Sequence, residues 1–240
     1  SVFKKFGSYE NHELLVVGRP SAKEYVKAIY GSLFDNFRES NFYIFEENGL
    51  YQWPDGPNHY WKNTIDYLKN TDNKSPWLWM ELDLLPLKPK WVDILESEYN
   101  KYSKPFMGTI QDTTTITSDQ LRINIARHLQ GTAVYPADIS KYCTICQYVD
   151  KLDKAFDITT QWEVVPRTHD TKLIQQGFRT INYKLQTNPL RIQGEDNGDM
   201  NGVISYANPV DPEAVLHHGC KDTSLAEILL SPEYNKVFLR

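Results

Sequence analysis

The chain has 240 residues, enough for one large α/β domain, and we expect a single domain over residues 1–240. A net charge of -5 and a pI near 5.7 argue against a protein whose main task is binding the nucleic-acid backbone. No apolar run reaches membrane-spanning length and no signal peptide is visible, so we expect a cytoplasmic protein without a membrane span.

Strands and helices alternate through the first half of the chain. After a short N-terminal helical end, hydrophobic periodicity predicts strand 12–17, helix 21–37, strand 42–45, helix 57–68, strand 77–80 and helix 91–102. Helix 21–37 begins at a capping box of Ser21 and Glu24, and Pro57 suits the first turn of the next helix.

The alternation continues to the C-terminal end. We predict strand 106–110, a flexible loop 111–118, helix 121–129, strand 131–135, helix 139–149, strands 162–165 and 178–185, and helix 224–230. Residues 187–202 are polar and rich in Asn, Gly and Asp, so we expect a mobile loop or lid there. This order is typical of an α/β fold with a Rossmann-like mixed, mostly parallel central sheet flanked by helices.

Three cysteines, Cys143, Cys146 and Cys220, form an odd set without a disulfide framework. Cys143 and Cys146 have CxxC spacing, but no second pair is present that would complete a zinc site. We therefore expect thiols in a reducing compartment.

Two acids follow the tryptophan-rich strand 77–80. The sequence WLWMELDLLPLKPKW suggests a strand buried on both faces, with Glu81 and Asp83 at its carboxyl end. In open α/β sheets ligands bind at that edge, so these carboxylates could hold a metal ion or a ribose. The alternative is a strand end with two solvated acids.

A second polar cluster is the sequence HHGCKDTSL, which begins at His217. An imidazole at a strand end, Gly219 allowing close backbone approach, Lys221 and a helix capped by Ser224 and Glu227 would suit a metal-bridged diphosphate. The alternative is a charged surface turn that caps the helix.

Together the two clusters resemble nucleotide-sugar glycosyltransferases of the GT-A fold, in particular a group of uncharacterised bacterial and phage glycosyltransferase-like proteins. The resemblance implies a DxD-type motif in which Asp83 binds a divalent ion and Glu81, a departure from Asp, lies toward the ribose or metal. It assigns His218 as the C-terminal metal ligand, with His217 as the fallback, and Lys221 as a contact to the diphosphate. We therefore expect Asp83 and His218 to approach each other at the ligand edge of one sheet and to share one divalent ion.

The stretch WPDGPNHYW resembles the segment of these enzymes that packs against the donor. Gly56, Pro57 and Asn58 are therefore candidate donor contacts, although helix capping explains them equally well. The GT-A fold usually opens with a base-binding strand that is not evident before residue 12, so we expect a first strand upstream of residue 1.

The function implied by the resemblance is metal-dependent transfer of a sugar from a nucleotide diphosphate sugar, UDP-sugar first, to an acceptor hydroxyl. Mn or Mg and Lys221 would offset charge on the departing diphosphate. An inverting enzyme needs a carboxylate base, for which Asp157 is our choice over Glu163 and Asp170. A retaining enzyme needs no such carboxylate base.

Two other functions fit parts of the sequence. A nucleotidyltransferase or metal-dependent phosphohydrolase also uses acids at strand ends, but the chain has no glycine-rich phosphate loop of the P-loop kind. A catalytically inactive sugar- or nucleotide-binding module would stack its many aromatics on glycans. The acceptor stays open among glycan, protein and modified nucleobase, and the acidic pI does not favour nucleic acid.

Overall fold

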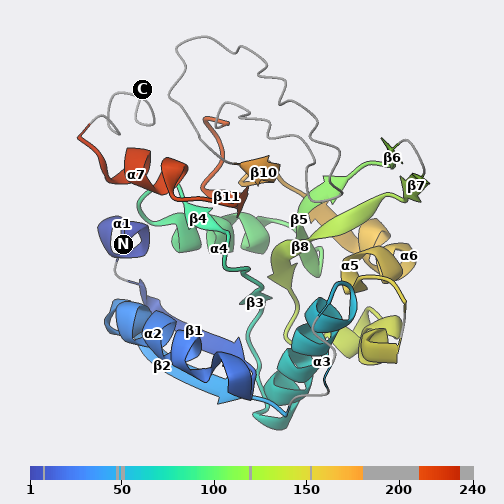
Figure 1. Cartoon of the computed structure of the whole chain (residues 1–240). Helices are drawn as coiled ribbons and strands as arrows, with labels where there is room; N and C mark the ends of the chain where they lie inside the picture. Colours follow the sequence, from blue (N-terminus) through green and yellow to red (C-terminus); the bar gives the residue numbers. More distant parts are fainter. Residues whose placement is uncertain are drawn as a thin grey trace. The chain divides into compact units, whose positions relative to one another are not determined.

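The computed structural model describes residues 1–7, 9–46, 49, 52–118, 121–151, 153–180 and 211–232. These residues form an α/β protein with several helices and mixed sheets, which confirms the predicted class (Figure 1). The chain divides into two compact units, and each unit is assembled from segments that are distant in sequence. The predicted lid, 187–202, lies outside the described residues.

The larger unit comprises Glu10–Trp79 and Tyr99–Thr171. Its strands and α-helices are β1 (Tyr9–Gly18), α2 (Lys23–Leu33), β2 (Phe37–Ile44), α3 (Asp55–Asn70), β3 (Trp77–Leu78), β5 (Phe106–Gln111), β6 (Thr114–Ser118), β7 (Leu121–Ile125), β8 (His128–Tyr135), α5 (Phe156–Thr159), α6 (Gln161–Val164) and β9 (Thr168–Asp170). Short 3-10 turns occupy Pro20–Ala22, Phe34–Asn36, Ile139–Lys141, Ile145–Gln147, Val149–Lys151 and Val165–Arg167.

The main sheet of this unit has the strand order β3-β8-β5-β9. Strand β8 pairs antiparallel with both β3 and β5, while β5 and β9 are parallel. Among the pairings with a described register, only this one and β10 with β11 are parallel. The prediction of a mostly parallel sheet is therefore wrong for the described strands, because hairpins and short returns replace several expected crossovers.

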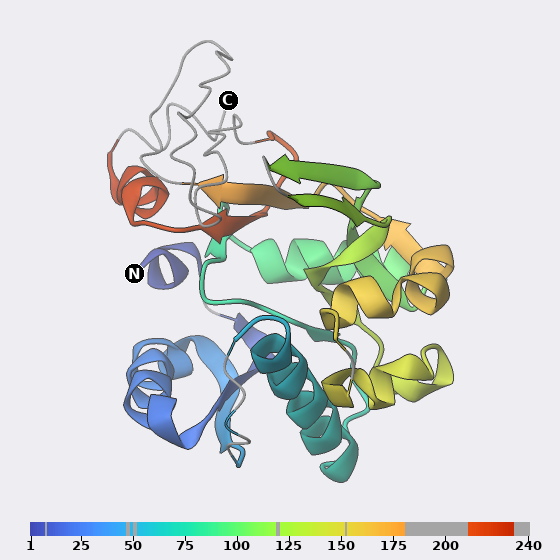
Figure 2. The same cartoon turned by 45° about the vertical axis from the view of Figure 1, so that its right-hand side comes forward.

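Trp61, on the buried face of α3, lies at the centre of the core of the larger unit. Its ring stacks on Phe156 with centroids 4.1 Å apart and meets the edge of Tyr135 at 4.4 Å. Trp77 and Trp79 pack against the same cluster but are only partly buried. The teal helix α3 and the yellow-green segments that it contacts are seen together in Figure 2. This packing explains why α3 follows its predicted apolar stripe closely.

The smaller unit comprises Ser1–Tyr9, Met80–Glu98 and Lys172–Arg240. Its described elements are α1 (Val2–Phe6), β4 (Leu85–Pro86), most of α4 (Trp91–Lys101), β10 (Ile174–Thr180), β11 (Leu216–Cys220) and α7 (Ser224–Leu230). The three strands form a sheet of order β10-β11-β4. Trp91 is 1% exposed and donates its indole N–H to the Tyr9 hydroxyl at 2.7 Å, which ties α4 to the N-terminal segment.

Several predicted elements have a different structure. Residues 111–118, predicted as a loop, contain β6, and residues 121–129, predicted as a helix, begin with β7, which pairs with β6 in a hairpin. The predicted strand 162–165 lies mostly in α6. Short apolar runs fit the periodicity of a helix and that of a strand, so the sequence pattern alone does not predict the structure of these segments. Helix 139–149 is replaced by separate 3-10 turns.

The first long helix starts later than the sequence suggests. Pro20 opens a 3-10 turn, and α2 begins at Lys23 with Ala22 as its N-cap residue and no side-chain capping bond. The predicted N-cap residue, Ser21, therefore lies in the 3-10 turn before the helix. Glu24 pairs with Lys27 at 3.0 Å on the exposed face.

The cysteine prediction is wrong for one pair. Cys143 and Cys146 form a disulfide, with their Cα atoms 5.6 Å apart. Both residues are almost fully buried in the core cluster of the larger unit, where a tight turn brings them together. Cys220 is a buried free cysteine, as expected of a thiol.

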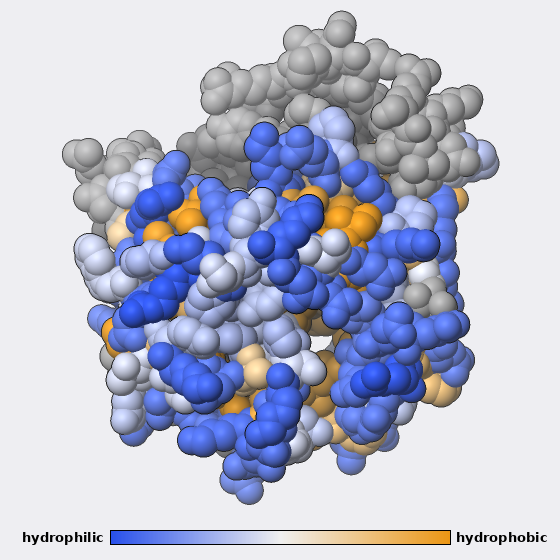
Figure 3. All heavy atoms as spheres, turned by 180° about the vertical axis from the view of Figure 1, so that it is seen from behind, coloured by the Kyte–Doolittle hydropathy of each residue, from blue (hydrophilic) through white to orange (hydrophobic). Residues whose placement is uncertain are grey.

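No described helix combines the length and hydrophobicity that a membrane span requires. The face shown in Figure 3 carries mainly hydrophilic side chains with small separate hydrophobic areas. The cytoplasmic location stays a prediction.

Candidate functional site

The two predicted acids lie in a tight turn rather than at the end of a core strand. Leu84 donates its backbone N–H to the Glu81 carbonyl at 3.2 Å, which closes the turn. Leu84 and Leu87 are buried and anchor it, whereas Leu82 is 87% exposed. The prediction of a strand buried on both faces is wrong, because β3 has only two residues and is the outer strand of its sheet.

Backbone hydrogen bonds hold this turn beside β11. Strand β4, which follows the turn, pairs antiparallel with β11. Cys220 donates its N–H to the Asp83 carbonyl, and Leu87 donates to the Val215 carbonyl, both at 2.8 Å. The predicted convergence of the two clusters therefore occurs through an antiparallel strand pair and not through neighbouring parallel strand ends.

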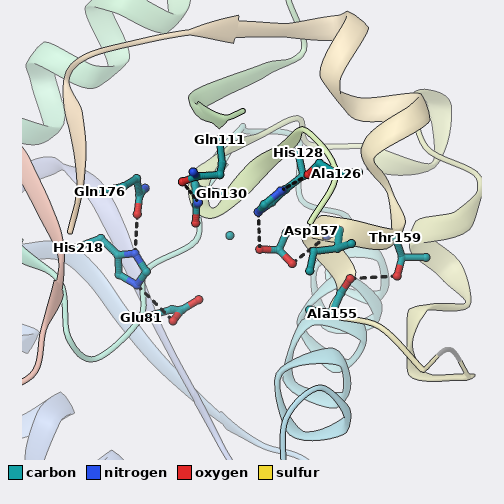
Figure 4. Close-up of polar contacts among 12 residues, drawn as sticks. Glu81, Gln111, Ala126, His128, Gln130, Ala155, Asp157, Thr159, Gln176 and His218 are labelled. Atoms are coloured by element: carbon teal, nitrogen blue, oxygen red, sulfur yellow. Dashed lines mark hydrogen bonds and ion pairs between the residues drawn. The ribbon is translucent and has the colours of Figure 1, made fainter. Parts of the chain in front are cut away.

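His218 lies inside β11 and is the centre of the cluster. Its Nε2 atom is 3.2 Å from Asp83 Oδ1 and 3.3 Å from Glu81 Oε2. Its Nδ1 atom faces Gln176 Oε1 at 2.6 Å, on the opposite side of the ring from Glu81 (Figure 4). The expected approach of Asp83 and His218 is confirmed.

Lys221 completes the cluster through an ion pair with Asp83 Oδ2. Its side chain is 45% exposed, compared with 16% for Asp83. Both oxygens of Asp83 thus face a cationic group, one from His218 and one from Lys221. Lys221 was predicted to contact a diphosphate, and in this structure it lies next to the carboxylates that would hold the metal.

Burial and charge act in opposite directions on the pKa values of this cluster. Burial lowers the pKa of His218, but hydrogen bonds to Asp83 and Glu81, together with their charges, raise it to about 9. Burial raises the pKa of Asp83, because it disfavours the charged form of an acid. Hydrogen bonds from His218 and Lys221 and their positive charges nevertheless hold this pKa well below its usual range. At neutral pH Asp83 is therefore a carboxylate that faces the imidazolium of His218.

His217, the fallback ligand, is in a different environment. It is 1% exposed, and burial together with the positive charge of His218 lowers its pKa to about 4, although Asp83 acts in the other direction. Successive residues of a strand point to opposite faces, so His217 and His218 cannot both face the carboxylates. The structure favours His218.

Gly219, predicted as a donor contact, has a backbone role. Its φ of +94° lies in the region that favours glycine, and a Cβ atom there would overlap the carbonyl oxygen of Gly177 in β10. Any other residue would push β10 and β11 apart next to His218.

The helix after the cluster starts as predicted, but its capping differs. Thr223 is the N-cap residue of α7, and its hydroxyl donates to the Glu227 carboxylate at 2.7 Å. The Asp222 carboxylate accepts the backbone N–H of Ser224 at 3.0 Å. The N-cap residue is therefore one position before the predicted Ser224, and it makes no side-chain capping bond to the helix backbone.

The predicted donor contacts Gly56, Pro57 and Asn58 lie in the first turns of α3 in the larger unit. Asn58 is fully buried, and its amide donates to the carbonyls of Val149 and Lys154 at 3.0 and 2.8 Å. These contacts show a structural role for Asn58, which joins α3 to the segment 149–154.

The three candidate bases also lie in the larger unit, and each accepts a backbone N–H. The acceptor oxygens of Asp157, Glu163 and Asp170 are 2.9, 2.5 and 2.9 Å from the nitrogen atoms that donate to them. Asp157 additionally faces His128 Nε2 at 3.9 Å (Figure 4). His128 was not predicted, because its segment was assigned to a helix instead of β8.

The cluster in the smaller unit fits a divalent cation. Glu81, Asp83 and His218 each offer a ligand atom, and these atoms lie within 4.8 Å of one another. Two carboxylates and one imidazole suit Mn²⁺, which accepts both oxygen and nitrogen ligands, better than they suit Mg²⁺. The chemistry of these donors therefore agrees with the predicted metal site.

No protein-family model matches the sequence, and a search of curated proteins finds no match.

Proposed function

We propose that this protein is a metal-dependent glycosyltransferase of GT-A type, which moves a sugar from a nucleotide diphosphate sugar to an acceptor hydroxyl. One observation carries the proposal: the side chains of Glu81, Asp83 and His218 form one cluster of possible metal ligands, although His218 is 137 residues from Glu81 in the sequence. These are the residues that the resemblance to GT-A enzymes assigns to the metal and donor.

The cluster supplies two kinds of group that a diphosphate requires. Glu81, Asp83 and His218 would hold Mn²⁺ or Mg²⁺, and a bound ion supplies Lewis-acid stabilisation of the negative charge on the leaving diphosphate. Lys221 ends in an ammonium group beside Asp83 and is exposed enough to turn toward a phosphate oxygen. Both contributions favour release of a nucleoside diphosphate.

The donor and acceptor are less defined than the site. A UDP-sugar is the first donor to test, and a glycan or protein hydroxyl suits the acidic chain better than a modified nucleobase does.

Three rival roles for the cluster predict different results. A structural ion-pair network of His218, Lys221 and the acids would bind no metal. An inactive module would bind donor and metal without turnover, and a nucleotidyltransferase would use a nucleoside triphosphate. Transferases often hydrolyse their donor slowly without acceptor, so donor hydrolysis separates the transferase from the binding module.

The experiment is a thermal-shift screen of nucleotide sugars with and without Mn²⁺, followed by calorimetry on the best donor. Binding to the native state raises the melting temperature by mass action, so we expect a shift that requires both nucleotide and Mn²⁺. Asp83→Asn should abolish this binding while keeping the fold, because it removes an anionic ligand from a small ligand set.

Glu213→Gln is the matched control, since it removes one exposed carboxylate from the same unit, outside the cluster. It should bind donor and metal like the wild type. Normal Mn²⁺-dependent donor binding by Asp83→Asn would exclude the proposed site, and absence of any nucleotide-sugar binding by the wild type would exclude the proposed function.

A further inference from the structure

One polar side chain outside the proposed ligand set contacts it directly. The Gln176 Oε1 atom lies 2.6 Å from His218 Nδ1, while His218 Nε2 faces the carboxylates of Glu81 and Asp83 (Figure 4). An amide oxygen can only accept a hydrogen bond, so Nδ1 must carry a hydrogen and donate it. The nitrogen that faces the carboxylates is then the one that can bind a metal, once the ion displaces the proton that this nitrogen carries in the imidazolium.

The strand register explains why these two side chains meet. Gln176 of β10 is the Cα partner of His218 of β11 in a parallel pairing, so both side chains stand on the same face of the sheet. Directly after this pair the register shifts, where Gly177 and Gly219 approach too closely for a side chain. The backbone on both strands is therefore constrained next to the contact.

The amide of Gln176 is not explained by packing alone. Its Nε2 atom is buried and has no hydrogen-bond partner among the residues that the structure describes. A buried donor without a partner is unfavourable, and an apolar side chain of similar size would avoid it. The contact between its Oε1 atom and His218 accounts for an amide at this position.

We propose that Gln176 is the positioning residue of the metal site: it holds the His218 ring with Nδ1–H toward β10 and Nε2 toward Glu81 and Asp83. This inference rests on the proposed function, because it gives Gln176 a role toward the same metal. Partners that orient a ligating histidine commonly change metal affinity by about 10–100-fold when they are removed. A neutral amide orients the ring without adding a third negative charge to the cluster.

The test measures Mn²⁺ binding by electron paramagnetic resonance of the free ion, in the wild type and in two variants. Gln176→Met keeps the length of the side chain but lacks the acceptor, so we expect about 10–100-fold weaker Mn²⁺ binding. Gln176→Glu keeps an acceptor, so we expect affinity at least equal to that of the wild type. Rescue by Glu would not be expected if Gln176 only filled space.

Gln175→Met is the matched control. Gln175 is the preceding residue of β10, points to the other face, and its Oε1 atom accepts the backbone N–H of Asp211 at 2.8 Å. The substitution removes the same kind of amide from the same strand, and we expect Mn²⁺ affinity to stay unchanged. Circular dichroism of each variant confirms that the protein is folded.

A second readout reports the hydrogen bond itself. In metal-free protein labelled with ¹⁵N-histidine, the Nδ1–H proton of His218 should exchange slowly with solvent in the wild type and in Gln176→Glu, and rapidly in Gln176→Met. If the wild type binds Mn²⁺ and Gln176→Met binds it equally well, the positioning role is wrong while the proposed function stands. If the wild type binds no Mn²⁺ even in the presence of saturating UDP, the proposed function itself fails.

Discussion

His218 Nε2 lies 3.2 Å from Asp83, and His128 Nε2 lies 3.9 Å from Asp157, so each of the two units contains a histidine that faces a carboxylate. Both are strand residues, and in both the Nδ1 atom faces an acceptor oxygen. For His218 this is the side chain of Gln176, and for His128 it is the backbone carbonyl of Ala126 at 2.8 Å.

The two histidines differ in what else meets them. His218 has a second carboxylate and lies beside Lys221, whereas Asp157 accepts a backbone N–H from Ile158. Among the described residues, only the group around His218 brings three ligand atoms together. A histidine next to one acid is common in proteins, and the convergence of three ligand side chains from separate segments is what indicates a metal site.

Exchanging each histidine for glutamine tests this difference directly and should give the largest effect. His218→Gln removes a proposed ligand, so we expect Mn²⁺ affinity to fall by at least about 100-fold, beyond the usual cost of losing an orienting partner. His128→Gln should leave Mn²⁺ affinity unchanged. Calorimetric titration of both variants with Mn²⁺ measures this, and equal losses in the two would contradict the assignment.

A pH titration of the metal-free protein tests the charge balance. His218 should stay protonated up to about pH 9, which histidine-selective NMR can follow. Because its pKa in the folded state lies above the ordinary value of 6.5, the stability it contributes is complete below about pH 6.5 and is lost as pH rises toward 9. Asp83 has a lowered pKa, so its contribution is present above its ordinary pKa and is lost as pH falls further.

Asp83→Asn should bring the pKa of His218 down, because it removes a hydrogen-bonding anion from the imidazolium. Glu213→Gln again serves as the control with equal loss of charge. A His218 that titrates near its ordinary value in the wild type would show that the cluster is more solvated than the structure indicates.

The elements that could be predicted are those with long, regular patterns. Helices α3 and α4 and strand β5 agree closely with their predicted ranges, and β8 contains its predicted range 131–135, because their apolar residues repeat over several turns or along a whole strand. Strand β7 and helix α6 were assigned wrongly, because runs of four or five residues fit either period. Tertiary pairing decides such segments.

The site was partly predictable for the same reason. Asp83 and His218 were expected to meet as two strand ends at one edge of the same sheet, and they do meet, but Asp83 lies in a turn and His218 within β11. Gln176 had no signal in the sequence, because its contact depends on the register of β10 against β11. No local motif specifies that register.

The smallest expected effect concerns Lys221. Its ammonium is paired with Asp83 Oδ2, so it competes with a metal ion for that oxygen. Lys221→Met should therefore strengthen binding of Mn²⁺ alone by about fivefold, corresponding to about 1 kcal/mol for a partly exposed ion pair. The same change should weaken binding of UDP in the presence of Mn²⁺, because it removes a positive charge available to the diphosphate.

A higher affinity for Mn²⁺ together with a lower affinity for UDP would distinguish this role from a general effect of removing one positive charge. Lys172→Met is the control, since it removes an exposed lysine of the same unit outside the cluster, and it should change neither affinity measurably. If Lys221→Met weakens Mn²⁺ and UDP together, Lys221 supports the fold of the site and does not compete with the metal. If it changes neither, the ion pair with Asp83 is a surface contact without a role in ligand binding.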